Sequence, residues 1–423
     1  MDYIKKTLKN GLRVIIVPMK DSLTATVRVF VGAGSEYETK NINGISHFLE
    51  HMCFKGTTNR PQPITIAKEL DSIGAAYNAG TGRDMTSYYA KAASRHFGKI
   101  SDIVADLYLN PLFDTTEIDK ERGVIVEEIN MYQDTPIQRI DDVLMRCMYG
   151  DQPAGWDILG PKDVIGKITK DDFIAYRSKH YVAKNTVLVI AGNVSEEQGT
   201  EMAEKYFSSM SATDVTPKER TNDMQEKPNI LLEEKDSDQS HLMLGFRAYP
   251  VGDERRWALS VLSTALGGGM SSRLFQRVRT ELGAAYYIGS MAESSIDKGC
   301  FAIAAGVNNE KLSVVVQAIV DECKKIVDEP LSEEELQATI EHIIGSFTVN
   351  LETSESLARY YGFQEMISGK IQTPEEKMER YKNVTAIDVQ KVAQDIFQNK
   401  KLNIALIGPK QDSDSLQQCA LVE

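Results

Sequence analysis

The segment GAAYNAGT at residues 74–81 returns in similar form, 209 positions later, as GAAYYIGS at residues 283–290. A second pair of matching segments lies near the end of each half of the chain. Thr169 and Thr385 are each followed by an aspartate three residues later and then by an apolar run that ends at a glycine, at an offset of 216 positions. In both places the threonine can cap a helix that leads into a buried strand. Two matches at nearly one offset, close to half of the 423 residues, predict a duplicated domain of about 210 residues.

The duplication predicts a domain at residues 1–210, a linker at residues 211–228 and a homologous domain at residues 229–423. The linker is polar and has no apolar periodicity. Within the first domain, alternating β-branched residues predict strands at residues 12–17 and 24–31. Because strands lead and helices interrupt them irregularly, the predicted fold class is α+β rather than a doubly wound parallel sheet.

Composition excludes several classes of protein. The chain has 48 Lys and Arg against 61 Asp and Glu and no long basic run, so nucleic acid is not an expected partner. No apolar stretch approaches the roughly 20 residues that span a membrane, and the N-terminus lacks the apolar core of a signal peptide. We therefore expect no membrane partner and a cytoplasmic location. The five cysteines are scattered, which argues against a disulfide framework or a Cys-x-x-Cys zinc site and favours buried thiols.

The sequence HFLEH at residues 47–51 carries the chemistry, and it lies in a predicted helix at residues 45–54. Residues four apart are neighbours on a helix surface, so His47 and His51 can bind one metal ion. Glu50 lies close enough to contact a ligand in the open position of that metal. This is the inverted zinc-peptidase motif H-x-x-E-H. The alternative is a helix end with two solvated histidines.

Catalytic zinc usually has three protein ligands and one open position, so a third donor is required. The other histidines are isolated, and no cysteine has a suitable spacing. A capping-box pattern predicts a second helix at residues 114–132, which carries Glu121, Glu127 and Glu128. Glu121 and Glu128 share one helical face, whereas Glu127 points about 100° away from Glu128. The pattern alone leaves all three as candidates, each with the alternative of a solvated surface acid.

The run GISHFLEHMCFKGT at residues 44–57 strongly resembles the pitrilysin or insulinase family of zinc peptidases, above all its mitochondrial processing peptidase-like bacterial branch. In that family 76 residues separate the second histidine from the glutamate that is the third zinc ligand, and the same spacing after His51 leads to Glu128. A family glutamate seven residues earlier, which supports the metal site, matches Glu121. The resemblance therefore implies that Glu127 is a solvated neighbour.

The resemblance extends into the second half of the chain. The run RLFQRVRTELGAAY at residues 273–286 is similar to the family segment whose arginine and tyrosine, seven residues apart, face the substrate. The matching residues are Arg279 and Tyr286, although this chain has TEL after Arg279 where many relatives have a more charged run. Asn78 and Ala79 match the edge strand on which the family lays its substrate, a mode of binding that uses main-chain pairing.

The family resemblance implies a zinc metalloendopeptidase with one Zn²⁺ per chain, which hydrolyses extended or unfolded peptides inside a closed chamber. Glu50 would be the general base on zinc-bound water, and Arg279 and Tyr286 would hydrogen-bond the substrate carbonyl or the developing oxyanion. The implied fold is two tandem homologous domains, each a mainly antiparallel sheet packed against helices, of which the second is non-catalytic.

The implied partners are peptide substrates and a second chain. Relatives of this length pair head to tail, so Arg279 and Tyr286 are expected to act on the zinc site of a homodimer partner. A heterodimer with a zinc-less paralogue is the alternative assembly. The alternative functions are a non-catalytic scaffold subunit of a related complex and a metal-dependent hydrolase of another substrate class.

Overall fold

A computed structural model describes residues 2–422. The described residues form two compact units, each of which takes most of its residues from one half of the chain and a short segment from the other half. Unit 1 comprises residues 2–130, 157–219 and 348–375, and unit 2 comprises residues 131–156, 220–347 and 376–422. The long stretch of unit 1 gives way to that of unit 2 after Glu219, inside the linker that the sequence predicts. The predicted domains at residues 1–210 and 229–423 describe the two copies of the duplicated sequence, and their exact boundaries stay a prediction.

Each unit contains one sheet, and the two sheets share a strand order apart from one additional edge strand, β1, in unit 1. The sheet of unit 1 has the order β1-β2-β6-β3-β5-β4, from β1 (Ile4–Thr7), β2 (Arg13–Pro18), β3 (Thr24–Val31), β4 (Ala76–Thr81), β5 (Thr86–Ala93) and β6 (Thr186–Gly192). The sheet of unit 2 has the order β7-β11-β8-β10-β9, from β7 (Asn229–Glu234), β8 (Gln239–Arg247), β9 (Ala285–Ser294), β10 (Gly299–Asn308) and β11 (Leu402–Gly408).

The strand pairing confirms the predicted duplication and the mainly antiparallel α+β fold. In unit 1 the pair β2–β6 is parallel and the other pairs are antiparallel, and in unit 2 the same holds for β7–β11. The two copies of the GAAY sequence lead into β4 and β9, which are the corresponding edge strands. Gly74 and Gly283 precede these strands with φ values of 63° and 53°, a conformation that glycine adopts without strain.

Helices surround both sheets. They are α1 (Ile45–Cys53), α2 (Pro63–Asp71), α3 (Phe97–Leu109), α4 (Thr115–Asp134), α5 (Pro136–Tyr149), α6 (Lys162–Ile165), α7 (Lys170–His180), α8 (Glu196–Phe207), α9 (Arg256–Gly267), α10 (Leu312–Asp328), α11 (Glu333–Val349), α12 (Ser354–Ser368), α13 (Pro374–Lys382), α14 (Ala386–Ile396) and α15 (Ser413–Cys419). The predicted helix caps are confirmed, because Thr169 and Thr385 each form a reciprocal capping box with the aspartate three residues later. Among the described residues, no helix combines the length and apolar character needed to cross a membrane.

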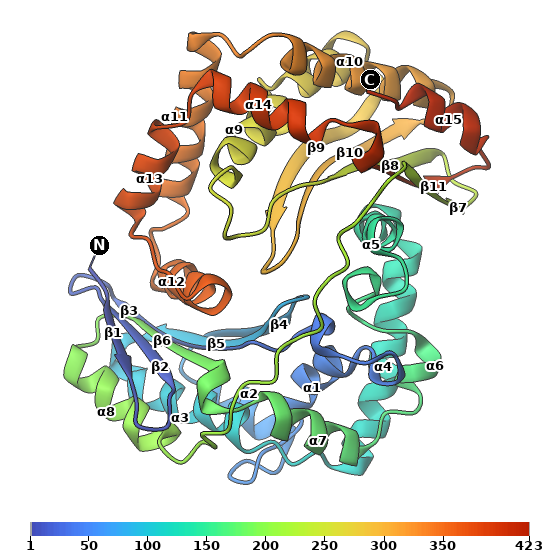
Figure 1. Cartoon of the computed structure of the whole chain (residues 1–423). Helices are drawn as coiled ribbons and strands as arrows, with labels where there is room; N and C mark the ends of the chain where they lie inside the picture. The colour runs from blue at the N-terminus through green and yellow to red at the C-terminus, as the bar shows by residue number, and fades with distance from the viewer. Residues whose placement is uncertain (1, 423) are drawn as a thin grey trace. The chain divides into compact units, whose positions relative to one another are not determined.

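The segment that unit 1 receives from the second half of the chain contains α12, which lies against β3 and β6 (Figure 1). Alternation along β3 places Thr26 and Arg28 on the face that α12 covers. The hydroxyl of Thr26 lies 2.8 Å from that of Ser354, and Arg28 donates to Glu355 at 2.7 Å. Polar residues in this strand are therefore paired with the first turn of α12 rather than exposed to solvent.

Glycine lets a helix approach each sheet closely. A Cβ atom at Gly362 in α12 would lie 2.1 Å from the ring of Phe30 in β3. In unit 2 the arrangement is reversed, because the glycine is Gly245 in β8 and the side chain is Leu144 in α5, 2.6 Å from such a Cβ. Each sheet is thus covered on one face by the helix that its unit receives from the other half of the chain.

Candidate metal centre

The helix that carries the HFLEH motif is held at its N-terminus by a buried carboxylate. Glu38 accepts hydrogen bonds from the backbone N–H groups of Gly44 at 2.7 Å and Ser46 at 2.8 Å, which α1 cannot satisfy itself. Burial raises the pKa of Glu38 to about 7, although these hydrogen bonds oppose the shift. The helix ends at Cys53, close to its predicted end, and Glu38 fixes its first turn, which contains His47.

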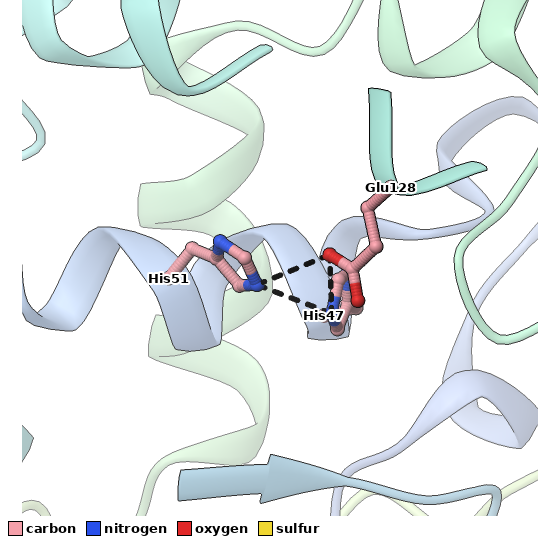
Figure 2. A group of neighbouring side chains, drawn as sticks. All are labelled: His47, His51 and Glu128. Atoms are coloured by element: carbon pink, nitrogen blue, oxygen red, sulfur yellow. Dashed lines mark hydrogen bonds and ion pairs between the residues drawn. The ribbon is translucent and has the colours of Figure 1, made fainter. Parts of the chain in front are cut away.

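Three side chains from α1 and α4 converge on one point (Figure 2). The Nε2 atoms of His47 and His51 are 3.2 Å apart, and Oε2 of Glu128 lies 3.7 Å from each of them. Ligands at roughly 2.0–2.1 Å from a tetrahedral zinc ion are about 3.3 Å from one another, so these separations fit such an ion. Of the three acids that the pattern leaves open, Glu128 is the one whose carboxylate reaches both imidazoles. Glu127 is exposed.

The ionisation of His47 also suits metal binding, whereas burial of His51 is outweighed by its hydrogen bond with Glu121 and by the nearby carboxylate charges, which raise its pKa. Burial, reinforced by the neighbouring His51, lowers the pKa of His47 to about 3, so this ring is neutral at physiological pH. Neutral imidazole is the form that binds a metal. Burial raises the pKa of Glu128, and a nearby Glu121 adds to the shift. A cation between these groups would offset that cost, because it favours the ionised carboxylate.

Glu121 lies behind His51, on the side away from His47. Its Oε1 atom is 2.8 Å from Nδ1 of His51, and its Oε2 atom is 2.5 Å from Nζ of Lys55. Burial would raise the pKa of Glu121, but the hydrogen bonds from His51 and Lys55 outweigh burial and lower it. The ionised carboxylate can only accept, so Nδ1 of His51 donates and its Nε2 lone pair is directed toward the metal centre.

Glu50 is nearly buried, with 9% of its surface exposed, and it stands on the same helix as the two histidines. Its Oε2 atom accepts a hydrogen bond from the hydroxyl of Thr81 at 2.6 Å. Burial raises the pKa of Glu50, the hydrogen bond from Thr81 opposes the shift, and the charges of His51 and Glu128 also act on it. The general-base role that the sequence predicts for Glu50 stays a prediction.

Asn78 and Ala79 lie on β4, the edge strand of the unit 1 sheet, which pairs with β5 on one side. Asn78 is exposed, and its side-chain oxygen accepts from the backbone N–H of Ala79 at 2.9 Å. The strand contacts α1 and ends at Thr81, next to Glu50. The predicted peptide-binding strand and the predicted general base are thus neighbours within one unit.

Arg279 and Tyr286 belong to unit 2. Arg279 is exposed on a π-helix (Phe275–Glu281), with its guanidinium group 5.0 Å from the ring centre of Phe275. Tyr286 is 58% exposed near the start of β9. Single π-helical turns occur frequently at functional sites. The roles of Arg279 and Tyr286 toward a substrate stay predictions.

Sequence reasoning assigned no role to three residues that contact this site. Lys55 follows His51 by four residues, two positions beyond the end of α1, and that spacing could have indicated a shared partner. Thr81 is the last residue of the strand that carries Asn78, so its closeness to the motif was open to inference. Glu38 caps α1 from a separate loop, and no short-range pattern indicated it.

Two family models match the chain. The model described as insulinase (peptidase family M16) matches residues 13–162, and the model described as peptidase M16 inactive domain matches residues 167–343. The chain is 35% identical over 404 residues to the uncharacterized zinc protease YmxG of Bacillus subtilis, which covers 95% of this chain and 97% of that protein. It is 37% identical over 410 residues to an uncharacterized zinc protease of Rickettsia felis, with 95% and 96% covered.

Solved structures agree with these matches. A protease from Helicobacter pylori has a TM-score of 0.90 and 25% identity, over 96% of this chain and 100% of that one. A peptidase M16 inactive domain from Pseudomonas fluorescens has the same fold, with a TM-score of 0.89 at 20% identity over 97% and 99% of the two chains. Because the chain matches both family models and is 35% and 37% identical to these two zinc proteases over 95% of its length, it belongs to the insulinase family of peptidases, family M16.

Proposed function

We propose that this chain is a zinc metalloendopeptidase that hydrolyses extended or unfolded peptides inside a closed chamber. The observation that carries the proposal is the convergence of two imidazole nitrogens and one carboxylate oxygen, from His47, His51 and Glu128, at separations that fit one zinc ion per chain. The names of the relatives support a zinc peptidase. A zinc ion at this centre would polarise the scissile carbonyl and make an attacking water more acidic.

In this proposal Glu50 accepts a proton from the attacking water and passes it to the leaving amine. The raised pKa of Glu50 favours both steps, because a general base works best when its pKa approaches the working pH. Glu121 acts behind the metal centre, where it fixes the ring of His51 through Nδ1. These two carboxylates differ in role because one is held by a hydroxyl and the other by the imidazole N–H of His51 and the ammonium of Lys55.

The substrate would pair with the open edge of β4, with main-chain hydrogen bonds to Asn78 and Ala79. Such pairing requires an extended backbone and depends little on side chains, which suits unfolded peptides. Arg279 and Tyr286 would donate hydrogen bonds to the substrate carbonyl or to the developing oxyanion. Their exposure leaves both side chains available to a ligand.

We further propose that the chain acts as a homodimer, in which Arg279 and Tyr286 serve the metal centre of the second copy. The match of residues 167–343 to a model described as an inactive domain supports a non-catalytic second half. Mixing a Glu50→Gln protein with an Arg279→Ala protein should then restore part of the activity that each lacks alone. Absence of complementation would contradict action in trans.

Cleavage of a quenched, unstructured peptide tests the proposed function, with and without a chelator and with metal content measured on the same preparations. Glu50→Gln should retain one zinc per chain and lose at least about 100-fold in kcat, the low end of general-base contributions. Glu127→Gln is the matched control, because it makes the same change at an exposed position beside Glu128. Normal cleavage by the Glu50 variant, or cleavage that a chelator does not affect, would contradict the mechanism.

A further inference from the structure

The hydroxyl of Thr81 is placed to fix one oxygen of Glu50. It donates to Oε2 at 2.6 Å, the short distance of a hydrogen bond to an ionised acceptor. Ala79 and Thr81 are two residues apart, and both are half-buried in a strand whose exposed positions alternate with them. Side chains two apart point to the same face of a strand, so Thr81 belongs to the face of β4 that is turned toward the protein.

Thr81 is itself held in position by the hairpin of β4 and β5. It pairs with Thr86, which is fully buried and whose hydroxyl donates to the carbonyl of Ala33 at 2.8 Å. The turn of the hairpin is tied to the same loop, because the backbone N–H of Ser35 donates to the carbonyl of Gly82 at 3.1 Å. This loop leads toward Glu38 and α1, so the strand and the motif helix are both hydrogen-bonded to the same loop.

We propose that Thr81 is a positioning residue for Glu50, which holds Oε2 so that the other carboxylate oxygen is directed to the reacting water. This inference rests on the proposed function, because it assigns Glu50 a proton-transfer role. It links that carboxylate to the strand that would bind the peptide. A peptide paired with β4 would order the strand that ends at Thr81, and the general base would be ordered with it.

Two substitutions separate this role from simple stabilisation of the hairpin. Thr81→Val keeps the branched shape and removes the hydroxyl, whereas Thr81→Ser keeps the hydroxyl and removes a methyl group. We expect Thr81→Val to lower kcat by roughly 10-fold or more with little change in KM, because the hydrogen bond that it removes involves a charged acceptor. Thr81→Ser should stay within about 3-fold of the wild type. Both variants should keep the wild-type melting temperature within a few degrees and the same zinc content.

A double-mutant cycle shows whether the hydroxyl acts through Glu50. In a Glu50→Gln background the positioned base is already absent, so Thr81→Val should cause little further loss of kcat. An equal loss in both backgrounds would overturn the proposal, because Thr81 would then act on the strand or on the metal centre. Equal kcat for Thr81→Val and wild type would overturn it as well.

A structural measurement distinguishes failure of this inference from failure of the proposed function. In crystals of the metal-free proteins, Glu50 should adopt one conformer in the wild type and in Thr81→Ser, and several in Thr81→Val. If the wild type cleaves no peptide yet shows this pattern, the proposed function fails and the positioning contact stands. If Glu50 is equally ordered in all three proteins, the positioning role is wrong whatever the activity.

Discussion

Replacement of Glu121 by glutamine should weaken zinc binding although it replaces none of the three proposed metal ligands. The carboxylate contacts Nδ1 of His51 at 2.8 Å and Nζ of Lys55 at 2.5 Å, and its side chain is only 6% exposed. Glutamine has nearly the same shape but offers one acceptor and one donor group in place of two acceptors. It therefore cannot accept from both neighbours through separate oxygens.

Either orientation of the new amide has a cost. If its oxygen accepts from His51, its NH₂ group faces the ammonium of Lys55, and two donors oppose each other. If its oxygen accepts from Lys55, the NH₂ group faces Nδ1 of His51 and favours the tautomer whose proton sits on Nε2, where a metal ligand needs a lone pair. Loss of such a supporting contact typically reduces metal affinity 10- to 100-fold, which is about 1.4–2.7 kcal/mol.

Zinc affinity is best measured by competition with a chromophoric chelator at a fixed pH of about 7.5. The control is Glu127→Gln, which removes the same charge from an exposed position on the same helix and should leave the dissociation constant within about 2-fold of wild type. Melting temperatures of the metal-free proteins show whether the fold is preserved. An unchanged zinc affinity in the Glu121 variant, or an equal loss in the Glu127 control, would refute the argument that the contact with His51 is what matters.

Three further outcomes are expected. Gly362→Ala should destabilise the protein by about 1–3 kcal/mol in denaturant unfolding because its Cβ would overlap a ring in β3, whereas Gly345→Ala, with open space in mid-helix, should stabilise it by up to about 1 kcal/mol. Burial lowers the pKa of His180 to about 4, so the folded state resists its protonation and stability should fall as the pH drops from about 6.5 toward 4. Across that range the free energy of unfolding should change with pH less steeply in His180→Leu than in the wild type, by up to about 1.4 kcal/mol per pH unit. The control is His342→Leu, which removes an exposed histidine and should keep the wild-type slope. A thiol reagent should modify Cys419 in the native protein and the four buried cysteines only after unfolding, because burial raises the pKa of their thiols.

The sequence predicts those features that depend on residues close together in the chain. Helical spacing alone places His47, Glu50 and His51 on one short helix, and the structure has that helix at Ile45–Cys53. The capping boxes at Thr169 and Thr385 are equally local, and both form as predicted. Internal similarity predicts the duplication, because it compares the chain with itself and needs no contact information.

Contacts between distant segments set the limit of these predictions. Alternation along β3 indicates a strand but cannot show what covers its polar side, and the answer is α12, more than 300 residues away in sequence. In the sequence Thr26 and Arg28 look like solvent-exposed positions of a strand. No sequence motif marks Ser354 and Glu355 as their partners. The reciprocal exchange of α5 and α12 is therefore visible only in three dimensions.

The choice of the third metal ligand among Glu121, Glu127 and Glu128 depends both on helical spacing and on the way two helices cross. Seven residues on a helix make two turns, so Glu121 and Glu128 extend from one face while Glu127 does not. In the structure these two acids serve the two nitrogens of one ring, Nδ1 and Nε2 of His51. Helical phase thus groups Glu121 with Glu128 but leaves all three acids as candidates, because it cannot say which acid meets the second histidine. That depends on how α4 crosses α1, and a seven-residue spacing is the same for either direction of crossing.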